Sequence, residues 1–213
     1  MAAYIVMAII AYAIGSVNFS VIISRKVAGF DVREKGSGNA GSTNMLRSVG
    51  KKAALMTLCC DILKGVVSIL IAIVIGIIAK DTANAAILVQ IASICVVIGH
   101  TYPIFFEFRG GKGVATSLGI ILLVNWQIGL ICLVFALALM AVTRMVSLGS
   151  ISAAVLFPIL TLAMTDHFIV EGNYFIFGIL LAAIVIFNHR TNIKRIIEGK
   201  ENKLSFKKKE ENK

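Results

Sequence analysis

The sequence predicts an all-α integral membrane protein, folded as a helical bundle of seven spans. Of its 213 residues, 58% are apolar and only 15% are charged, whereas a soluble domain carries about 25% charged residues. The mean hydropathy is +0.91, and the apolar residues gather in seven separate runs. This composition excludes a disordered chain, which could not keep so much apolar surface in water.

Seven apolar runs are the expected spans. They are Ala2–Ser24, Ala53–Ala79, Ala85–Ile104, Gly113–Val124, Ile128–Thr143, Ser147–Thr165 and Tyr174–Phe187. A straight span needs about 20 apolar residues, and the first three runs and the sixth satisfy that requirement. The other three are short, so they borrow flanking residues, tilt, or belong to a protein-lined re-entrant pair. No basic segment precedes the first run, which indicates a retained span and not a cleaved signal peptide.

The distribution of basic residues predicts the orientation. The chain carries 21 Lys and Arg against 11 Asp and Glu. With seven spans and the N-terminus outside, 19 of the 21 basic residues face the cytoplasm, leaving Lys64 inside a span and Lys80 outside. The positive-inside rule favours this arrangement. The rule rejects a single helix over Gly113–Thr143, because that would place the basic tail outside the cell. The alternative is five spans with Gly113–Thr143 as a re-entrant pair, which leaves both termini on the same sides as seven spans do.

The domain organisation follows from the same pattern. Residues 1–202 are expected to form one membrane domain, with 203–213 as a basic, disordered cytoplasmic tail. The four cysteines all lie in apolar runs and form no C-x-x-C motif, which argues against a zinc site and a disulfide framework. They are Cys59, Cys60, Cys95 and Cys132.

A dense glycine-rich and polar segment follows the first span. Its three glycines leave the backbone free to turn N–H groups toward an anion, and Arg47 can bind phosphate through paired hydrogen bonds. The segment also supplies neutral hydrogen-bonding side chains, namely Ser37, Asn39, Thr43 and Asn44. It matches G-x-G-x-x-G formally, but no strand precedes it, so a dinucleotide site is excluded. The simpler alternative is a flexible linker between two spans.

A second glycine-rich segment leads into the fourth apolar run. Its residues are Gly99-His100, Arg109, Gly110, Gly111, Lys112, Gly113 and Thr116. It is not a P-loop, because Gly113 stands where Ser or Thr must follow the lysine. A helix N-terminus beside a lysine still offers free N–H groups and a positive dipole end, which predicts an anion site. A membrane-edge turn with a snorkelling lysine is the alternative.

Two further polar groups lie on the same predicted side. After the fifth run, Ser147 has the position of a helix N-cap. After the last run, His189, Asn192 and Arg195 recur at steps of three, so a continuing helix would place them on roughly one face. A basic helix at the membrane surface is the simpler account of this last group.

Two ionisable residues fall inside an expected span. Asp61 and Lys64 lie three positions apart in the second run, and each would cost about 2.5–3.5 kcal/mol at the bilayer centre. We expect them to face the bundle and to pair with each other or with Arg47. They form either a structural ion pair or part of the functional site. No metal site is expected, since H-E-x-x-H and closely spaced aspartates are absent, and His100 and His167 are interpreted as helix-end or surface residues.

In their order along the chain, these motifs resemble the bacterial acyl-phosphate:glycerol-3-phosphate acyltransferase family of the PlsY type. The similarity covers Ala2–Asn202, and no motif position departs from the family pattern. The resemblance implies transfer of a fatty acyl group from acyl phosphate to the 1-hydroxyl of sn-glycerol 3-phosphate. The products are lysophosphatidic acid and phosphate, in phospholipid biosynthesis. It also implies a multi-pass protein of the bacterial cytoplasmic (inner) membrane, monomeric and surrounded by lipid, with the active site facing the cytoplasm and no nucleic-acid partner.

The resemblance also implies the site residues. The catalytic positions are Ser37, Arg47, Lys112, His189 and Asn192. The substrate-binding positions are Gly38, Asn39, Thr43, Asn44, His100, Gly110, Gly111, Gly113, Thr116, Arg144, Ser147 and Ser150. Glu201 is expected to be structural, and no cofactor or metal is implied.

The donor chemistry sets what catalysis has to supply. Acyl phosphate is a mixed anhydride with a good leaving group, so positioning and oxyanion stabilisation carry most of the expected rate enhancement. The proton of the glycerol hydroxyl goes either to His189 or to the donor's own phosphate, and we favour the phosphate. The H-x-x-x-x-D motif of another large acyltransferase group follows none of the three histidines.

A transporter of phosphate or phosphoester anions is the rival function. Seven spans, a positive inner side and the Asp61–Lys64 pair would suit it. Against it, the sequence has no visible internal repeat, and its basic motifs gather at one side, whereas a carrier binds near the bilayer midplane. An acyl-enzyme on Cys59 or Cys60 is disfavoured, because neither has the electropositive surroundings of an activated thiol.

Overall fold

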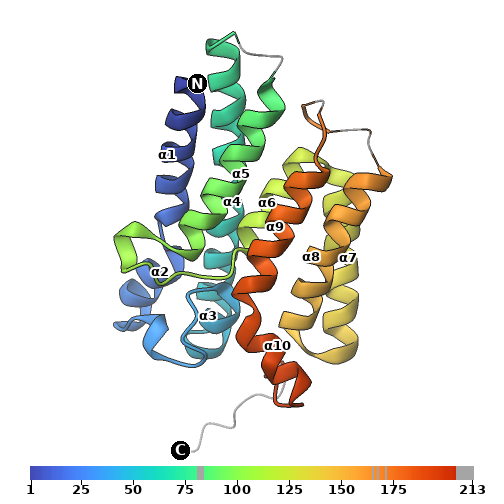
Figure 1. Cartoon of the computed structure of the whole chain (residues 1–213). Coiled ribbons are helices and arrows are strands. Elements are labelled where there is room, and N and C mark those ends of the chain that lie inside the picture. Colours follow the sequence, from blue (N-terminus) through green and yellow to red (C-terminus); the bar gives the residue numbers. More distant parts are fainter. Residues whose placement is uncertain (81–83, 165, 167, 171, 205–213) are drawn as a thin grey trace, which may run out of the picture.

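The computed structural model describes residues 1–80, 84–164, 166, 168–170 and 172–204, and every regular element in them is helical. The α-helices are α1 (Ala2–Ser16), α2 (Phe19–Ala28), α3 (Ser42–Ser48), α4 (Lys51–Ile78), α5 (Ala85–Thr101), α6 (Val114–Val124), α7 (Trp126–Thr143), α8 (Val146–Ala163), α9 (Phe175–Asn188) and α10 (Arg190–Ile197) (Figure 1). Two short 3-10 helices, η1 (Val32–Glu34) and η3 (Ile104–Phe106), lie in the connections.

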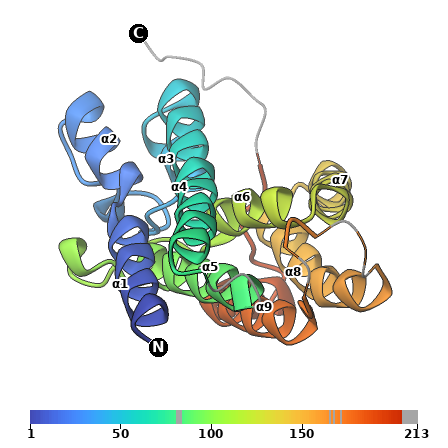
Figure 2. The same cartoon turned by 90° about the horizontal axis from the view of Figure 1, so that it is seen from above.

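The bundle consists of two groups of helices joined by α6. Helices α1, α4 and α5 pack on one another, and α7, α8 and α9 form a second group. Viewed from above, α6 runs from α4 to α7 (Figure 2). Small residues allow close backbone contact: a Cβ at Gly99 of α5 would lie 2.3 Å from Tyr12 O of α1, and one at Gly119 of α6 would lie 2.3 Å from Ile62 O of α4.

Length and composition identify five candidate spans among the described residues, and a sixth if α9 and α10, bent by 63°, count as one. The first candidate joins α1 and α2. Helix α6 has 11 residues, about 16 Å at 1.5 Å per residue, which is half of a bilayer core. Helix α7, with 18 residues, meets the criterion alone. Apolar helices therefore occupy all seven predicted runs, while the count of seven crossings stays a prediction.

Three local expectations are corrected. The first run is not one helix, because α1 ends at Ser16 and α2 restarts at Phe19 after Asn18, whose side chain accepts from Val21 N. Ser147 does not cap α8, which already begins at Val146. The last helix does not continue straight through His189, where α9 gives way to α10.

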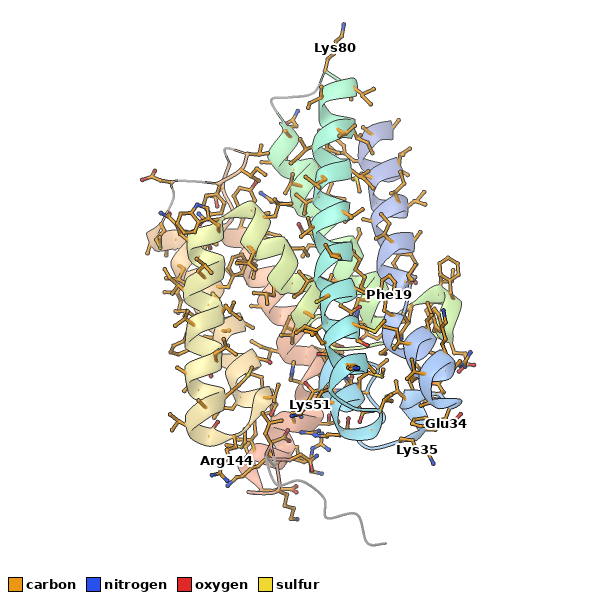
Figure 3. The ribbon with its side chains drawn as sticks, turned by 180° about the vertical axis from the view of Figure 1, so that it is seen from behind. Phe19, Glu34, Lys35, Lys51, Lys80 and Arg144 are labelled. Carbon is orange, nitrogen blue, oxygen red and sulfur yellow. The ribbon has the colours of Figure 1, made fainter. Side chains whose placement is uncertain are left out.

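The two ends of the bundle differ in character. One end carries α2, α3, α10 and the loop from residue 29 to residue 41; we call it the basic end (Figure 1). Figure 3 places Lys35, Lys51 and Arg144 at this end and Lys80 at the other. The outer faces between them expose large apolar side chains such as Val74, Val134 and Ile176, as expected for contact with lipid. Thr82 of the predicted external loop, His167 and the tail from residue 205 lie outside the described residues.

Candidate active site

A cavity of about 360 Å³ opens at the basic end and extends into the bundle, a volume in the usual range for small-molecule sites. Its mouth is lined by Ser37, Asn39, Thr43, Asn44, Arg47, Lys112, Ser147, Ser150, His189, Asn192, Arg195 and Glu201. Its interior is apolar and is lined by Leu118, Ile121, Cys132, Leu133, Ala136, Ala153, Phe157, Leu181, Ala182 and Val185. The cavity therefore joins a hydrogen-bonding, charged compartment to an apolar one.

The cavity also reaches the outer face of the bundle. Leu58 of α4, Leu118 of α6 and the exposed Leu137 of α7 are among its lining residues. The apolar part of the cavity therefore reaches a side chain that is exposed on the outer face of the bundle.

The structure brings most of the predicted site residues together. All five predicted catalytic residues line the cavity, as do seven of the predicted binding residues: Asn39, Thr43, Asn44, His100, Gly113, Ser147 and Ser150. The other five do not line it: Gly38, Gly110, Gly111, Thr116 and Arg144. Asp61, Arg195 and Glu201 do line it although they are outside the predicted set. For Arg195, the feature of the sequence that could have identified it as a site residue is its spacing of three residues from Asn192.

Asn44 shapes the first loop from within. Its amide nitrogen donates to Val32 O at 2.9 Å and to Lys35 O at 3.0 Å, and its amide oxygen accepts from Ser37 N at 3.0 Å. Gly36 has φ +60°, and a Cβ there would lie 2.3 Å from the Asn44 oxygen. Asn44 is therefore occupied in holding the turn that presents Ser37.

An ion-pair clamp joins the first loop to the second. Asp31 pairs with Arg33 at 2.8 Å and with Arg25 at 2.9 Å, while Arg33 Nη1 donates to Phe106 O at 2.8 Å. Burial raises the pKa of the Asp31 carboxyl, but the hydrogen bonds and charge of Arg33 outweigh it and bring the pKa down to about 2. The clamp stays ionised at neutral pH and fixes the two loops relative to each other.

The second loop has fewer free N–H groups than its sequence suggests. Gly110 N donates to Thr101 O and Gly111 N to His100 O, each at 3.1 Å. Gly113, with φ +86°, forms the N-cap of α6, and the N–H groups of the first turn of α6 have no intrahelical acceptor. Anion binding at this loop thus falls to the α6 N-terminus and to the Lys112 ammonium.

Lys112 is the central cation of the cavity. Its Nζ donates to the Asn192 side-chain oxygen. Burial lowers its pKa to about 8, against the opposing effect of the Glu201 carboxylate, and Arg195 and Arg47 lower it further. Burial likewise lowers the pKa of Arg47. Three cations facing one carboxylate make this mouth electrostatically suited to an anion.

The chain after α10 folds back over the mouth. Glu201 Oε1 accepts from Asn192 Nδ2 at 2.7 Å and from Ser147 Oγ at 2.8 Å, and Oε2 lies 3.3 Å from Arg195 Nε. Leu204 N donates to Arg144 O at 2.8 Å. Glu201 thereby joins α8 to α10.

His189 is held as a neutral side chain. Its Nδ1 lies 2.8 Å from Val185 O, so Nδ1 carries the proton and Nε2 is the acceptor in the neutral ring. Burial lowers its pKa to about 4, opposed by the Val185 hydrogen bond. Among the described contacts, no carboxylate hydrogen-bonds this ring: the Glu201 oxygens contact Ser147, Asn192 and Arg195.

Fold and cavity together define a polytopic helical membrane protein with a cationic mouth above an apolar interior. A family profile described as glycerol-3-phosphate acyltransferase matches residues 5–199. The chain belongs to the glycerol-3-phosphate acyltransferase family, as its motifs predict.

Individual relatives agree over nearly the whole length. The glycerol-3-phosphate acyltransferase of Clostridioides difficile (strain 630) is 45% identical over 206 residues, covering 96% of this chain and 97% of the relative. That of Thermoanaerobacter sp. (strain X514) is 43% identical over 200 residues, covering 94% and 95%. The crystal structure of PlsY (YgiH), an integral membrane glycerol 3-phosphate acyltransferase, is similar in its glycerol 3-phosphate form with a TM-score of 0.83, 34% identity and coverage of 95% and 96%. Its lysophosphatidic acid form gives a TM-score of 0.81, 32% identity and coverage of 95% for each chain.

Proposed function

We propose that the protein transfers a fatty acyl group from acyl phosphate to the 1-hydroxyl of sn-glycerol 3-phosphate, releasing lysophosphatidic acid and phosphate. One observation carries the proposal: a single cavity joins a mouth with three cations to an apolar interior that reaches the exposed Leu137 of α7. Both substrates carry a phosphate, and the donor and the product also carry an acyl chain. Family membership and the two ligand forms of the related PlsY structure support the same acceptor and product.

The residues of the cavity divide between the two substrates. Lys112 and the N-terminus of α6 bind the phosphate of the acceptor, while Arg47 and Arg195 hold the phosphate of the donor. Ser37 and Asn39 donate hydrogen bonds to the acyl carbonyl oxygen, where negative charge develops. The acyl chain lies in the apolar interior. The acceptor oxygen attacks the carbonyl carbon, the bond to the phosphate oxygen breaks, and phosphate leaves with the electron pair.

The proton of the attacking hydroxyl goes to the phosphate of the donor. His189 is a poor base at neutral pH, because burial brings its pKa to about 4 although the Val185 hydrogen bond and the Glu201 charge oppose the shift. Its unprotonated Nε2 instead accepts a hydrogen bond and orients a substrate hydroxyl. Positioning then accounts for most of the catalysis, and neither a cofactor nor a metal is needed.

The cavity faces the cytoplasm in this proposal. The basic end becomes the inner side, the protein spans the bacterial inner membrane seven times as a monomer, and the N-terminus lies outside. A cysteine introduced at Thr82 in a cysteine-free variant should react with an impermeant thiol reagent in intact cells. One at the exposed Lys35 of the basic end should react only after permeabilisation. The opposite pattern would reverse the orientation.

Transport of phosphate esters is the function that an experiment has to separate from this one. Purified protein in detergent, without any sealed vesicle, should form lysophosphatidic acid from palmitoyl phosphate and labelled glycerol 3-phosphate, also in the presence of EDTA. If proteoliposomes took up the label and the protein in detergent formed no product, the protein would be a transporter and not an acyltransferase. Activity lost in EDTA and restored by a divalent ion would overturn the metal-free mechanism.

A further inference from the structure

Three ionisable side chains that the proposed reaction does not use are buried together at the wall of the cavity, which Asp61 and His100 line. Asp61, Lys64 and His100 expose only 2%, 5% and 6% of their surface. Asp61 Oδ1 lies 3.0 Å from Lys64 Nζ and 3.5 Å from His100 Nδ1. Sequence alone left Arg47 as a second candidate partner for Asp61; the structure places His100 there instead. The carboxylate thus connects a lysine on its own helix, α4, with a histidine at the end of α5.

Lys64 anchors this group on the side away from the cavity. Its Nζ donates to Gly15 O and Val17 O, each at 3.0 Å. These carbonyls lie at the C-terminal end of α1, where helix geometry leaves them without intrahelical partners. The ammonium also forms an ion pair with Asp61 Oδ1 at 3.0 Å. Lys64 therefore fixes Asp61 to the break between α1 and α2 and does not line the cavity.

His100 contacts the glycine-rich loop through both its backbone and its ring. Its carbonyl accepts from Gly111 N at 3.1 Å. Because Nδ1 faces Asp61, the opposite edge of the ring faces Gly111, where an added Cβ would lie 2.2 Å from His100 Nε2. The same Cβ would lie 2.7 Å from Ala40 O of the first loop. Gly111 is thus enclosed between the imidazole and the first loop, directly before Lys112.

We propose that Asp61 is a positioning residue that acts through His100. The carboxylate fixes the rotation of the imidazole, the imidazole fixes Gly111, and Gly111 sets the direction in which Lys112 projects toward Asn192. This assignment rests on the proposed function, because it places the phosphate-binding lysine for glycerol 3-phosphate. A displacement of about 1 Å at such a group can lower activity by about 100-fold, so the effect of losing the carboxylate is measurable.

Asp61→Asn and His100→Gln test the proposal, alone and combined. Each should raise the KM for glycerol 3-phosphate by about 10- to 100-fold and leave the KM for palmitoyl phosphate nearly unchanged. The double variant should resemble His100→Gln alone, because residues that act in series are not additive. Thr57→Val is the matched control: Thr57 is also buried on α4, one turn earlier, and its hydroxyl bonds only to Ala53 O among the described contacts. It should leave both KM values unchanged.

Two additions keep the outcome clear. If Asp61→Asn does not fold because Lys64 stays charged, the neutral Asp61→Asn/Lys64→Met variant takes its place. The affinity of the full protein for glycerol 3-phosphate, measured by calorimetry without a donor, reports the phosphate-binding geometry of the glycine-rich loop independently of acyl transfer. Weaker binding in the variants would support the proposal even with another acyl donor. Equal losses for both substrates, or additive losses in the double variant, would overturn it. A wild-type protein that binds no glycerol 3-phosphate would overturn the proposed function itself.

Discussion

The Lys112 ammonium donates a hydrogen bond to the Asn192 side-chain oxygen and so joins the loop before α6 to α10, 80 positions away in the sequence. Asn192 in turn donates to Glu201, which also accepts from Ser147 of α8. This chain of contacts leaves the buried cation with a neutral acceptor. A substrate phosphate is a stronger, charge-assisted partner, so it can take the ammonium from Asn192 without breaking the rest of the network.

The pH dependence of acceptor capture should report Lys112. Its pKa of about 8 means that the ammonium is present below pH 8 and is lost above it. kcat/KM for glycerol 3-phosphate, which follows the free enzyme, should therefore fall as pH rises through 8. Lys112→Arg keeps its charge at these pH values, so its alkaline limb should move upward, while Lys112→Met should lose nearly all activity. If the alkaline limb of the pH profile stayed at the same pH in Lys112→Arg, the titrating group would be one other than Lys112.

Gly111→Ala should impair the acceptor more than the donor. Gly111 does not line the cavity, and its new Cβ would meet the His100 ring and the Ala40 carbonyl, which shifts the loop and Lys112 with it. We expect the KM for glycerol 3-phosphate to rise about 10-fold or more, with a smaller change for palmitoyl phosphate. Gly29→Ala is the control, since Gly29 has φ +72° but no atom within 4 Å of an added Cβ. Equal effects of Gly111→Ala on both substrates would indicate a folding defect.

His189→Ala should keep the acidic limb of the pH profile. If the donor phosphate accepts the proton, the limb lies near the second phosphate pKa of about 6 and persists in the variant at a much lower rate. If His189 were the base, the limb would lie near its pKa of about 4 and would vanish in the variant. Steady-state kcat measured from acid to neutral pH with palmitoyl phosphate separates the two. If the residual activity of His189→Ala did not change over this pH range, His189 would be the base that accepts the proton in the wild-type protein.

Phe157→Ala should shift the preference toward longer acyl chains. Phe157 is buried at the apolar end of the cavity, edge-on to Phe177 with ring centroids 5.9 Å apart, so it limits the depth available to the chain. The ratio of kcat/KM for stearoyl phosphate to that for myristoyl phosphate should increase. Phe135→Ala, on the exposed face of α7, should leave the ratio unchanged. An unaltered ratio in Phe157→Ala would mean that Phe157 does not limit the length of the acyl chain.

Hydropathy predicted the helices well because lipid exposure requires apolar side chains whatever the tertiary contacts. The run Ala85–Ile104 corresponds to α5 (Ala85–Thr101), and Tyr174–Phe187 to α9 (Phe175–Asn188). Asp61 and Lys64 pair and face inward as expected, because the bilayer allows them no other environment.

Long-range hydrogen bonds were beyond the reach of local patterns. Ser147 has the position of an N-cap, yet its hydroxyl bonds to Glu201, 54 residues away. The glycines of the second loop indicate free N–H groups, yet Gly110 and Gly111 donate to carbonyls at the end of α5. In both places the competing partner comes from a distant segment that only the packed bundle brings near.

The identity of the acyl donor tests the account most directly. Purified wild-type protein in detergent should be assayed for lysophosphatidic acid with labelled glycerol 3-phosphate and one of three donors: palmitoyl phosphate, palmitoyl-CoA or palmitoyl-acyl carrier protein. Lys112→Met, prepared identically, serves as the inactive control. The account predicts product with palmitoyl phosphate alone, since the mouth suits a compact phosphate leaving group and the reaction has no base to assist a thioester. Efficient acylation from either thioester, with none from palmitoyl phosphate, would contradict it.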